Sequence, residues 1–194
     1  ANSLLRNIIT VTLLIEGIGA ASIFMLWPEG VVFQSLSDKI FYSVFHSISA
    51  FNNAGFSLFT DNLYDPALRN NFLLHIPVML LIFLGSLGFG AIIDIFGIGN
   101  MRERMRLPWK RVRISTTVAL NSSIILVLFG AILFYFTERN NTLSGMSTFG
   151  TVVTSFFQSV TPRTAGFNSV NMAELAAPTL LLMVFLMFIG GSSG

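Results

Sequence analysis

The sequence predicts an all-α membrane protein made of two parallel copies of a helix, re-entrant pore loop, helix repeat. Three observations lead to this fold class. Only 10% of the 194 residues are charged, whereas a soluble domain usually carries about 25%. The mean hydropathy is +0.74, and the apolar residues gather in long segments. A loop motif that follows one short apolar segment also recurs in the second half of the chain.

The first predicted repeat covers residues 1–100. A membrane-crossing helix needs about 20 mostly apolar residues, and residues 8–27 and 72–96 have this length. Residues 40–51 are apolar but too short to cross, and runs of that length are re-entrant or core helices. We therefore expect a crossing helix, a half-helix with a loop, and a second crossing helix.

A basic loop at residues 101–113 separates the two repeats. It holds six of the eleven basic residues of the chain and one acid. The positive-inside rule places such a loop in the cytoplasm. Binding of lipid headgroups or nucleic acid is the alternative reading of these charges, but basic residues beside a span are routine, and we expect no nucleic-acid partner.

The second predicted repeat covers residues 114–194. It has the same order: a span at residues 118–136, a short apolar segment at residues 146–160, and a last apolar segment from residue 178. The chain stops inside an apolar Gly/Ser run, so we expect it to be a fragment of a longer protein.

The two repeats resemble each other in sequence. Residues 45–56 align without a gap on residues 156–167, and both stretches end in Ala-Gly-Phe. Phe-Leu-Gly at residues 83–85 matches Phe-Ile-Gly at residues 188–190. Both copies run in the same direction, so they are related by an axis along the membrane normal. A pore lies naturally on such an axis.

The polar loops after the half-helices imply a cavity. Non-helical backbone at membrane depth is tolerated only where it is buried in protein or lines a water-filled path. Gly55 and Gly166 permit backbone angles that turn carbonyl oxygens inward, and rings of carbonyls can replace the hydration shell of a cation. The alternative is that these glycines only allow close helix packing. Their matching positions in two repeats favour the pore.

Three motifs resemble those of the bacterial Trk/Ktr potassium transporters, which belong to a superfamily with plant HKT and fungal Trk proteins. They are Phe-Asn-Asn-Ala-Gly-Phe-Ser at residues 51–57, Thr-Pro-Arg-Thr-Ala-Gly-Phe-Asn at residues 161–168, and Phe-Ile-Gly-Gly-Ser-Ser-Gly at residues 188–194. The resemblance implies four such units around one pore. This chain then looks like the second and third units, half of a pseudo-fourfold pore like that of potassium channels.

The resemblance also assigns site residues. It implies a selectivity filter that binds potassium through the backbone carbonyls of eight residues, with no other cofactor: Asn53, Ala54, Gly55, Phe56, Thr164, Ala165, Gly166 and Phe167. It implies an intramembrane gate loop that begins with five further residues: Gly190, Gly191, Ser192, Ser193 and Gly194.

Arg163 stands directly before the second filter motif. A guanidinium that faced the axis would repel cations. We therefore expect it to point away and to pair with a carboxylate or with loop carbonyls, as a scaffold of the filter. Asn52 occupies the aligned position in the first repeat, and we expect the same role for it.

Four other polar residues lie within apolar segments. Glu16, in the first span, is either a buried carboxyl bonded to the pore helix or a functional acid. We expect His46 and His75 to be packing or interfacial residues. Asp94 lies near the cytoplasmic end of its span, where it can pair with the basic loop.

The predicted function is potassium uptake by a multi-pass protein of the bacterial plasma (inner) membrane, and not catalysis. The resemblance further implies a homodimer of pore subunits, and a cytoplasmic nucleotide-binding ring that opens or closes the gate. The alternatives are a sodium-permeable or sodium-coupled cation transporter of the same architecture, a symporter of organic solutes, and an intramembrane enzyme. The sequence has no Walker loop and no Ser/His/Asp set suited to catalysis.

Overall fold

The computed structural model describes residues 2–107 and 111–191, and within these ranges the chain is helical without strands. This confirms the prediction of an all-helical protein with apolar helices. The elements follow in the order α1 (Asn2–Leu26), α2 (Leu36–Phe51), η1 (Asn62–Tyr64), α3 (Phe72–Ser86), α4 (Phe89–Phe96), α5 (Ile98–Arg106), α6 (Ile114–Glu138), α7 (Thr148–Val160), η2 (Thr161–Arg163), η3 (Met172–Glu174) and α8 (Ala177–Ile189).

Among the described residues, two helices are long and apolar enough to cross a membrane. They are Leu5–Leu26 within α1 and Ile114–Glu138, which is α6. The predicted spans at residues 8–27 and 118–136 lie almost entirely inside these helices, so both are confirmed as helices of spanning length. The short segments predicted at residues 40–51 and 146–160 correspond to α2 and α7.

The prediction of a single crossing helix at residues 72–96 is wrong in that the helix is broken. The segment is divided into α3 and α4, whose axes differ by 107°. Gly88, between them, has φ +79° and ψ 152°, a conformation that is open to glycine and costly for other residues. Pro77, in contrast, lies inside α3 without ending it.

The fourth apolar segment forms α8, which has 13 residues. It ends at Ile189, and the next residue, Gly190, has φ +64°. Gly190 and Gly191, the first two residues of the predicted gate loop, thus follow the end of α8. Ser192, Ser193 and Gly194 of the predicted gate loop lie outside the described residues.

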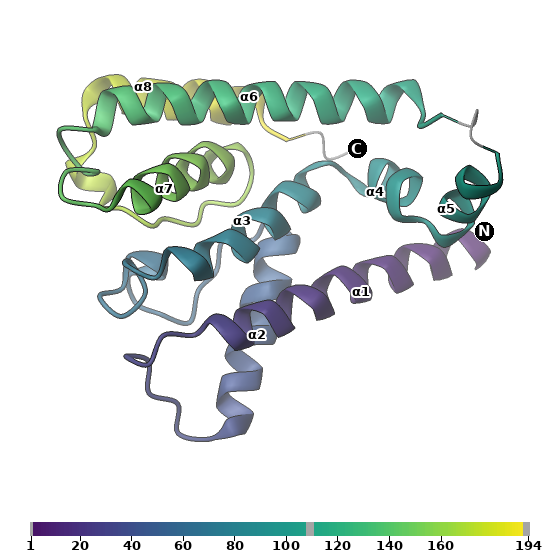
Figure 1. Ribbon diagram of the computed structural model, residues 1–194, viewed down its shortest axis with the longest axis horizontal. Coiled ribbons are helices and arrows are strands. Elements are labelled where there is room, and N and C mark those ends of the chain that lie inside the picture. The colour runs from purple at the N-terminus through teal and green to yellow at the C-terminus, as the bar shows by residue number, and fades with distance from the viewer. Residues whose placement is uncertain (1, 108–110, 192–194) are drawn as a thin grey trace.

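Helix α2 packs against α1 and α3, and α7 packs against α6; the two predicted repeats meet chiefly where α3 packs on α7. Figure 1 shows α6 and α8 together along the upper edge, then α7 and α3, and then α1, which α2 crosses; α2 extends farthest from α6. The N-terminus, α5 and the beginning of α6 lie at one end of the molecule, so α1 and α6 run in one direction while α3 and α8 run in the other.

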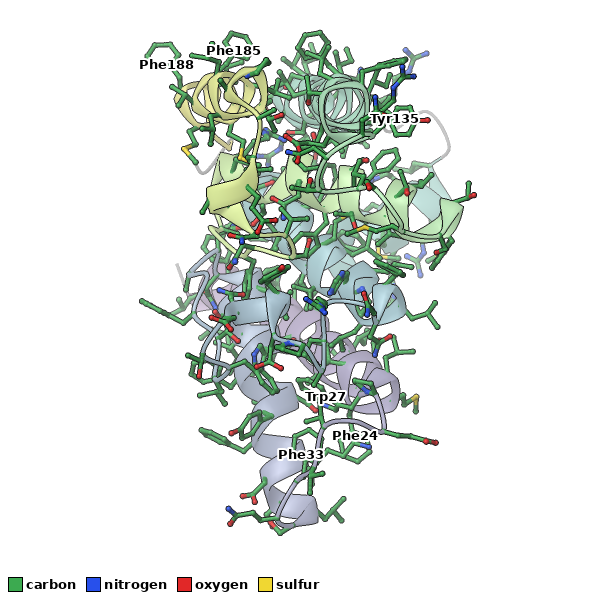
Figure 2. The ribbon with its side chains drawn as sticks, turned by 90° about the vertical axis from the view of Figure 1, so that its left-hand side faces the viewer. Phe24, Trp27, Phe33, Tyr135, Phe185 and Phe188 are labelled. Atoms are coloured by element: carbon green, nitrogen blue, oxygen red, sulfur yellow. The ribbon has the colours of Figure 1, made fainter. Side chains whose placement is uncertain are left out.

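The buried core lies around the loops at the centre. Phe51 and Ile82 of the first repeat and Phe157 and Phe167 of the second belong to one cluster of buried apolar residues. The outer faces of the helices are apolar as well. Figure 2 shows Phe185 and Phe188 of α8 pointing away from the rest of the molecule, and Phe188 is 90% exposed.

Candidate functional site

The two loops that the sequence singled out lie in direct contact. Each follows the C-terminal end of a short helix, α2 in the first repeat and α7 with η2 in the second. Gly55 has φ +72° and Gly166 has φ +77°. A Cβ atom added to Gly55 would collide with the carbonyl oxygen of Ala165, whereas one on Gly166 would meet nothing within 4 Å. Gly55 is therefore required both by its backbone angle and by the neighbouring loop.

A hydroxyl group at the end of each short helix holds the loop that follows. Ser49 Oγ donates to the carbonyl oxygen of Phe56 at 2.7 Å, and Thr161 Oγ1 donates to that of Phe167 at the same distance. The backbone nitrogen of Ala54 donates to Ser49 O at 2.8 Å, and that of Ala165 donates to Thr161 O at 3.0 Å. Both loops are thus folded back onto their own helix by the same pair of bonds.

The two loops differ by one residue. Ser49 precedes Phe56 by seven residues, whereas Thr161 precedes Phe167 by six. The gapless alignment is therefore wrong for the helix ends, although it matches the two glycines. The first loop takes up its extra residue at Asn53, which has φ +53°. Asparagine is among the few residues that adopt this left-handed conformation at low cost.

A second matched pair of hydrogen bonds fixes the far end of each loop. His46 Nε2 lies 3.0 Å from Ser57 Oγ, and Gln158 Nε2 donates to Ser169 Oγ at 3.2 Å, with the same separation of eleven residues. His46 Nδ1 lies 2.7 Å from the carbonyl oxygen of Tyr42. Because a carbonyl only accepts, Nδ1 carries the proton and Nε2 accepts from Ser57. The histidine predicted as a packing residue thus also positions the loop.

The Asn53 side chain joins both loops to the end of α3. With its amide oriented for best hydrogen bonding, Nδ2 donates to Thr164 Oγ1 at 3.0 Å and to Ile82 O at 3.1 Å, and Oδ1 accepts from Ser86 N at 3.2 Å. Ile82 O and Ser86 N are one i, i+4 pair of a helix. A side chain that inserts into this ladder is a known cause of helix bending, and α3 ends at Ser86.

Arg163 is buried, with 6% of its surface exposed. Its Nε donates to the carbonyl oxygen of Gly190 at 3.1 Å, and Nη2 donates to Ser123 Oγ on α6 at 3.2 Å. Within the described ranges, no carboxylate lies at ion-pair distance from it. Arg163 was predicted to pair with a carboxylate or with a loop carbonyl, and it pairs with a carbonyl. This carbonyl belongs to Gly190, the first residue of the predicted gate loop.

Gly191 lies at the same junction. A Cβ atom there would lie 2.7 Å from Thr164 Cγ2 and 3.1 Å from Ser86 Cβ. The end of α8 is therefore packed against the second loop and against the end of α3, so that both repeats contribute to its surroundings.

Asn52 is exposed and donates from Nδ2 to Glu16 Oε1 at 3.0 Å and to Ile48 O at 2.9 Å. Ser47 Oγ donates to the backbone oxygen of Glu16 at 2.7 Å. The Glu16 carboxyl is therefore hydrogen-bonded at the end of α2. This contact was expected if Glu16 is a carboxyl bonded to the short helix, the first of its two predicted roles. Asp94 pairs with the basic loop as predicted, since Arg104 Nη2 lies 3.7 Å from its Oδ1.

A cavity of about 320 Å³ lies beside the first loop, and its lining includes the side-chain amides of two asparagines and a threonine hydroxyl. The lining residues are Phe51, Asn52, Asn53, Gly85, Gly88, Phe89, Ile92 and Thr164. The C-terminal end of α2 opens into it, and such an end is partly negative. The cavity thus offers oxygen atoms and no net charge, which suits a monovalent cation better than an anion.

Sequence reasoning missed Ser49 and Thr161, and it missed the link through Asn53 and Ser86. A signal for the first two was present, since both short helices end with a small hydroxyl residue shortly before the Ala-Gly-Phe motif. No sequence signal marks Ser86, because its contact comes from the fold.

Comparison with known proteins identifies the family to which the chain is similar. Residues 1–194 match the TrkH family, described as cation transport protein. The chain is 37% identical over 192 residues to the Ktr system potassium uptake protein B of Vibrio alginolyticus, covering 98% of this chain and 40% of that protein. It is 36% identical over 193 residues to the potassium/sodium uptake protein NtpJ of Enterococcus hirae, again covering 98% and 40%.

A third relative, the Ktr system potassium uptake protein B of Bacillus subtilis, is 36% identical over 161 residues, which cover 81% of this chain and 34% of that protein. The chain thus spans about two fifths of the length of the relatives first named. The match to the family extends over all the residues of this chain, and it agrees with the long apolar helices. The chain belongs to the TrkH family of cation transport proteins.

Proposed function

We propose that this chain forms half of the ion path of a multi-pass potassium uptake protein in the bacterial plasma (inner) membrane. The proposal rests above all on one observation: two loops with left-handed glycines, each held by a hydroxyl on its own helix, lie in contact. Residues 1–100 and 114–194 are the two repeats, and residues 101–113 are the cytoplasmic loop between them.

The hydrogen bonds of the loops suggest which carbonyl groups face the ion. Those of Phe56 and Phe167 accept the helix hydroxyls, and that of Gly55 accepts from Asn62 Nδ2 at 3.1 Å. Within the described residues, five other filter carbonyls accept no protein hydrogen bond: Asn53, Ala54, Thr164, Ala165 and Gly166. These five oxygens are the ones best placed to replace water around potassium.

Uptake then needs no chemical step. A cation that reaches the cavity is stabilised by carbonyl and amide oxygens and by the negative end of α2. The membrane potential contributes about 2.3 kcal/mol per charge per 100 mV. Gly190 and Gly191 begin the gate, and their contacts with Arg163 and Thr164 support a gate that lies against the second loop.

Two assembly partners belong to the proposal: a second pore subunit in a homodimer, and a cytoplasmic nucleotide-binding ring that controls the gate. Both are supported by the resemblance in the filter and gate motifs. A sodium-permeable or sodium-coupled transporter of the same architecture is the second candidate, because one relative is named a potassium/sodium uptake protein. The relatives are named as transport proteins, which argues against an intramembrane enzyme.

Uptake of radioactive rubidium by the full-length protein, in cells that lack other potassium transport, tests the function. Gly55→Ser and Gly166→Ser test the filter. We expect both to lower the preference for potassium over sodium, and Gly55→Ser to be the more severe, because its Cβ also meets the Ala165 carbonyl. Membrane insertion is checked on the same cells. Unchanged selectivity in both inserted variants overturns the filter assignment.

A further inference from the structure

We propose that α5 is an interfacial helix that binds anionic phospholipid headgroups at the cytoplasmic surface of the membrane. This helix is not part of the ion path, and the proposal goes beyond transport. Met101 and Met105 are four residues apart, so they lie on one face of the helix, and they are 46% and 76% exposed. Arg102 and Arg106, with the same spacing, form an adjoining exposed face.

The third side of α5 is turned toward the protein. Arg104 Nη2 lies 3.7 Å from Asp94 Oδ1 on α4, and only 23% of the Arg104 side chain is exposed. Asn100 Nδ2 donates to the backbone oxygen of Ile93 at 3.1 Å. The helix is therefore held against α4 by one face, and its methionine and arginine faces are directed outward.

Two candidate spans begin at the end of the molecule where α5 lies, which puts α5 near a membrane surface. One of them, helix α6, begins at Ile114, which is 83% exposed. Arg113 directly precedes this helix, and its backbone nitrogen donates to Asp94 Oδ2 at 2.8 Å. Figure 1 shows α5 at the same end of the molecule as the beginning of α6 and the N-terminal end of α1. Asp94 thus contacts both Arg104 of α5 and Arg113, directly before α6.

Binding to lipid accounts for both the methionine face and the arginine face of α5, whereas binding to an acidic protein accounts only for the arginine face. A helix at a membrane interface buries apolar side chains among acyl chains while its basic side chains contact phosphates. The two methionines and the two arginines lie as this arrangement requires. An acidic protein surface would satisfy the arginines alone and would leave an exposed methionine face without a reason.

The test uses the full-length protein with its only cysteine at position 105 (Met105→Cys), labelled with an environment-sensitive fluorophore and reconstituted into vesicles. In phosphatidylcholine vesicles that contain increasing phosphatidylglycerol, we expect the emission to shift to the blue, with less shift at high salt. Each arginine near an anionic surface contributes about fivefold to binding. The double variant Arg102→Gln, Arg106→Gln should lower the apparent affinity for phosphatidylglycerol by about 25-fold.

Arg69→Gln is the matched control, because Arg69 precedes α3 and packs over the ring of Tyr64, away from α5; its emission should follow the unsubstituted protein. Equal emission in the two kinds of vesicle overturns the proposal, and so does a double variant that responds as the control does. An emission shift that needs an added cytoplasmic regulatory ring and ignores phosphatidylglycerol identifies a protein-docking helix instead, which also overturns it.

Discussion

At the scale of residues, small polar side chains at the helix ends decide the shape of the site. Ser49 and Thr161 each give a hydroxyl to the carbonyl of a phenylalanine that ends the Ala-Gly-Phe motif. The bond of Thr161 is fully buried, and Thr161 is 1% exposed. A buried acceptor that loses its donor costs about 1–3 kcal/mol. One hydroxyl therefore has a measurable share in holding each loop.

Thr161→Val tests that share, because valine keeps the shape and removes the hydroxyl. We expect it to lower the free energy of unfolding by about 1–3 kcal/mol and to weaken the preference for potassium over sodium. Thermal unfolding of the purified full-length protein and ion uptake measure the two effects. Thr161→Ser, which retains the hydroxyl, is the control. Valine and serine variants that behave alike would show that the bond does not hold the loop.

At the scale of elements, the helices could be predicted from the sequence and the break in the second span could not. The spans now seen as α1 and α6, and the short helices α2 and α7, follow from the lengths of the apolar runs. The sequence at residues 85–88 is Gly-Ser-Leu-Gly, and small residues of this kind are also common inside straight membrane helices. The break lies where Gly88 has φ +79° and where the amide of Asn53, from a distant loop, bonds to Ile82 and Ser86.

The motifs of the candidate site could be predicted from the sequence, whereas the contacts between them could not. The resemblance gave the two loop motifs and the first residues after α8, and the charge of Arg163 alone argued that it needs a partner. Its partner, Gly190, is 27 residues away, and no pattern in one sequence joins such residues. The one-residue difference in length between the two loops could not be predicted either, because the two sequences align without a gap.

A pair of glycines tests the break between α3 and α4. Gly88 has φ +79° and ψ 152°, a backbone region essentially restricted to glycine, so Gly88→Ala should destabilise the protein by about 1–3 kcal/mol. Gly90 lies inside α4, where an added Cβ atom would meet nothing within 4 Å, so Gly90→Ala should be neutral or stabilise by up to about 1 kcal/mol. Thermal unfolding of the two full-length variants gives the comparison. If the helix continued straight through Gly88, both substitutions would act in the same direction.

At the scale of the whole molecule, the two predicted repeats pack as one unit around the loops. They meet where α3 packs on α7, and the buried core contains side chains from both. The end of α8 is held by Arg163 of the second loop and packs against Ser86 of the first repeat. A displacement of the Gly190 segment is therefore expected to reach both loops through these contacts, so that the proposed gate and the proposed filter would be coupled.

The bond between Asn53 and Thr164 gives a direct measure of that unity, because it joins loops 111 residues apart. In a cycle of Asn53→Ala, Thr164→Val and the double variant, we expect a coupling free energy of about 0.5–3 kcal/mol in unfolding, as for contacting residues in one network. The effects on the potassium to sodium uptake ratio should be non-additive as well, because either single change already frees both loops at this point.

Ser49→Ala combined with Thr164→Val is the matched comparison. Ser49 holds only its own loop, so the effects of these two changes should be closer to additive. Additive effects in the Asn53–Thr164 cycle would mean that each repeat holds its loop alone, and coupling through the junction at Ser86 would then have to be abandoned.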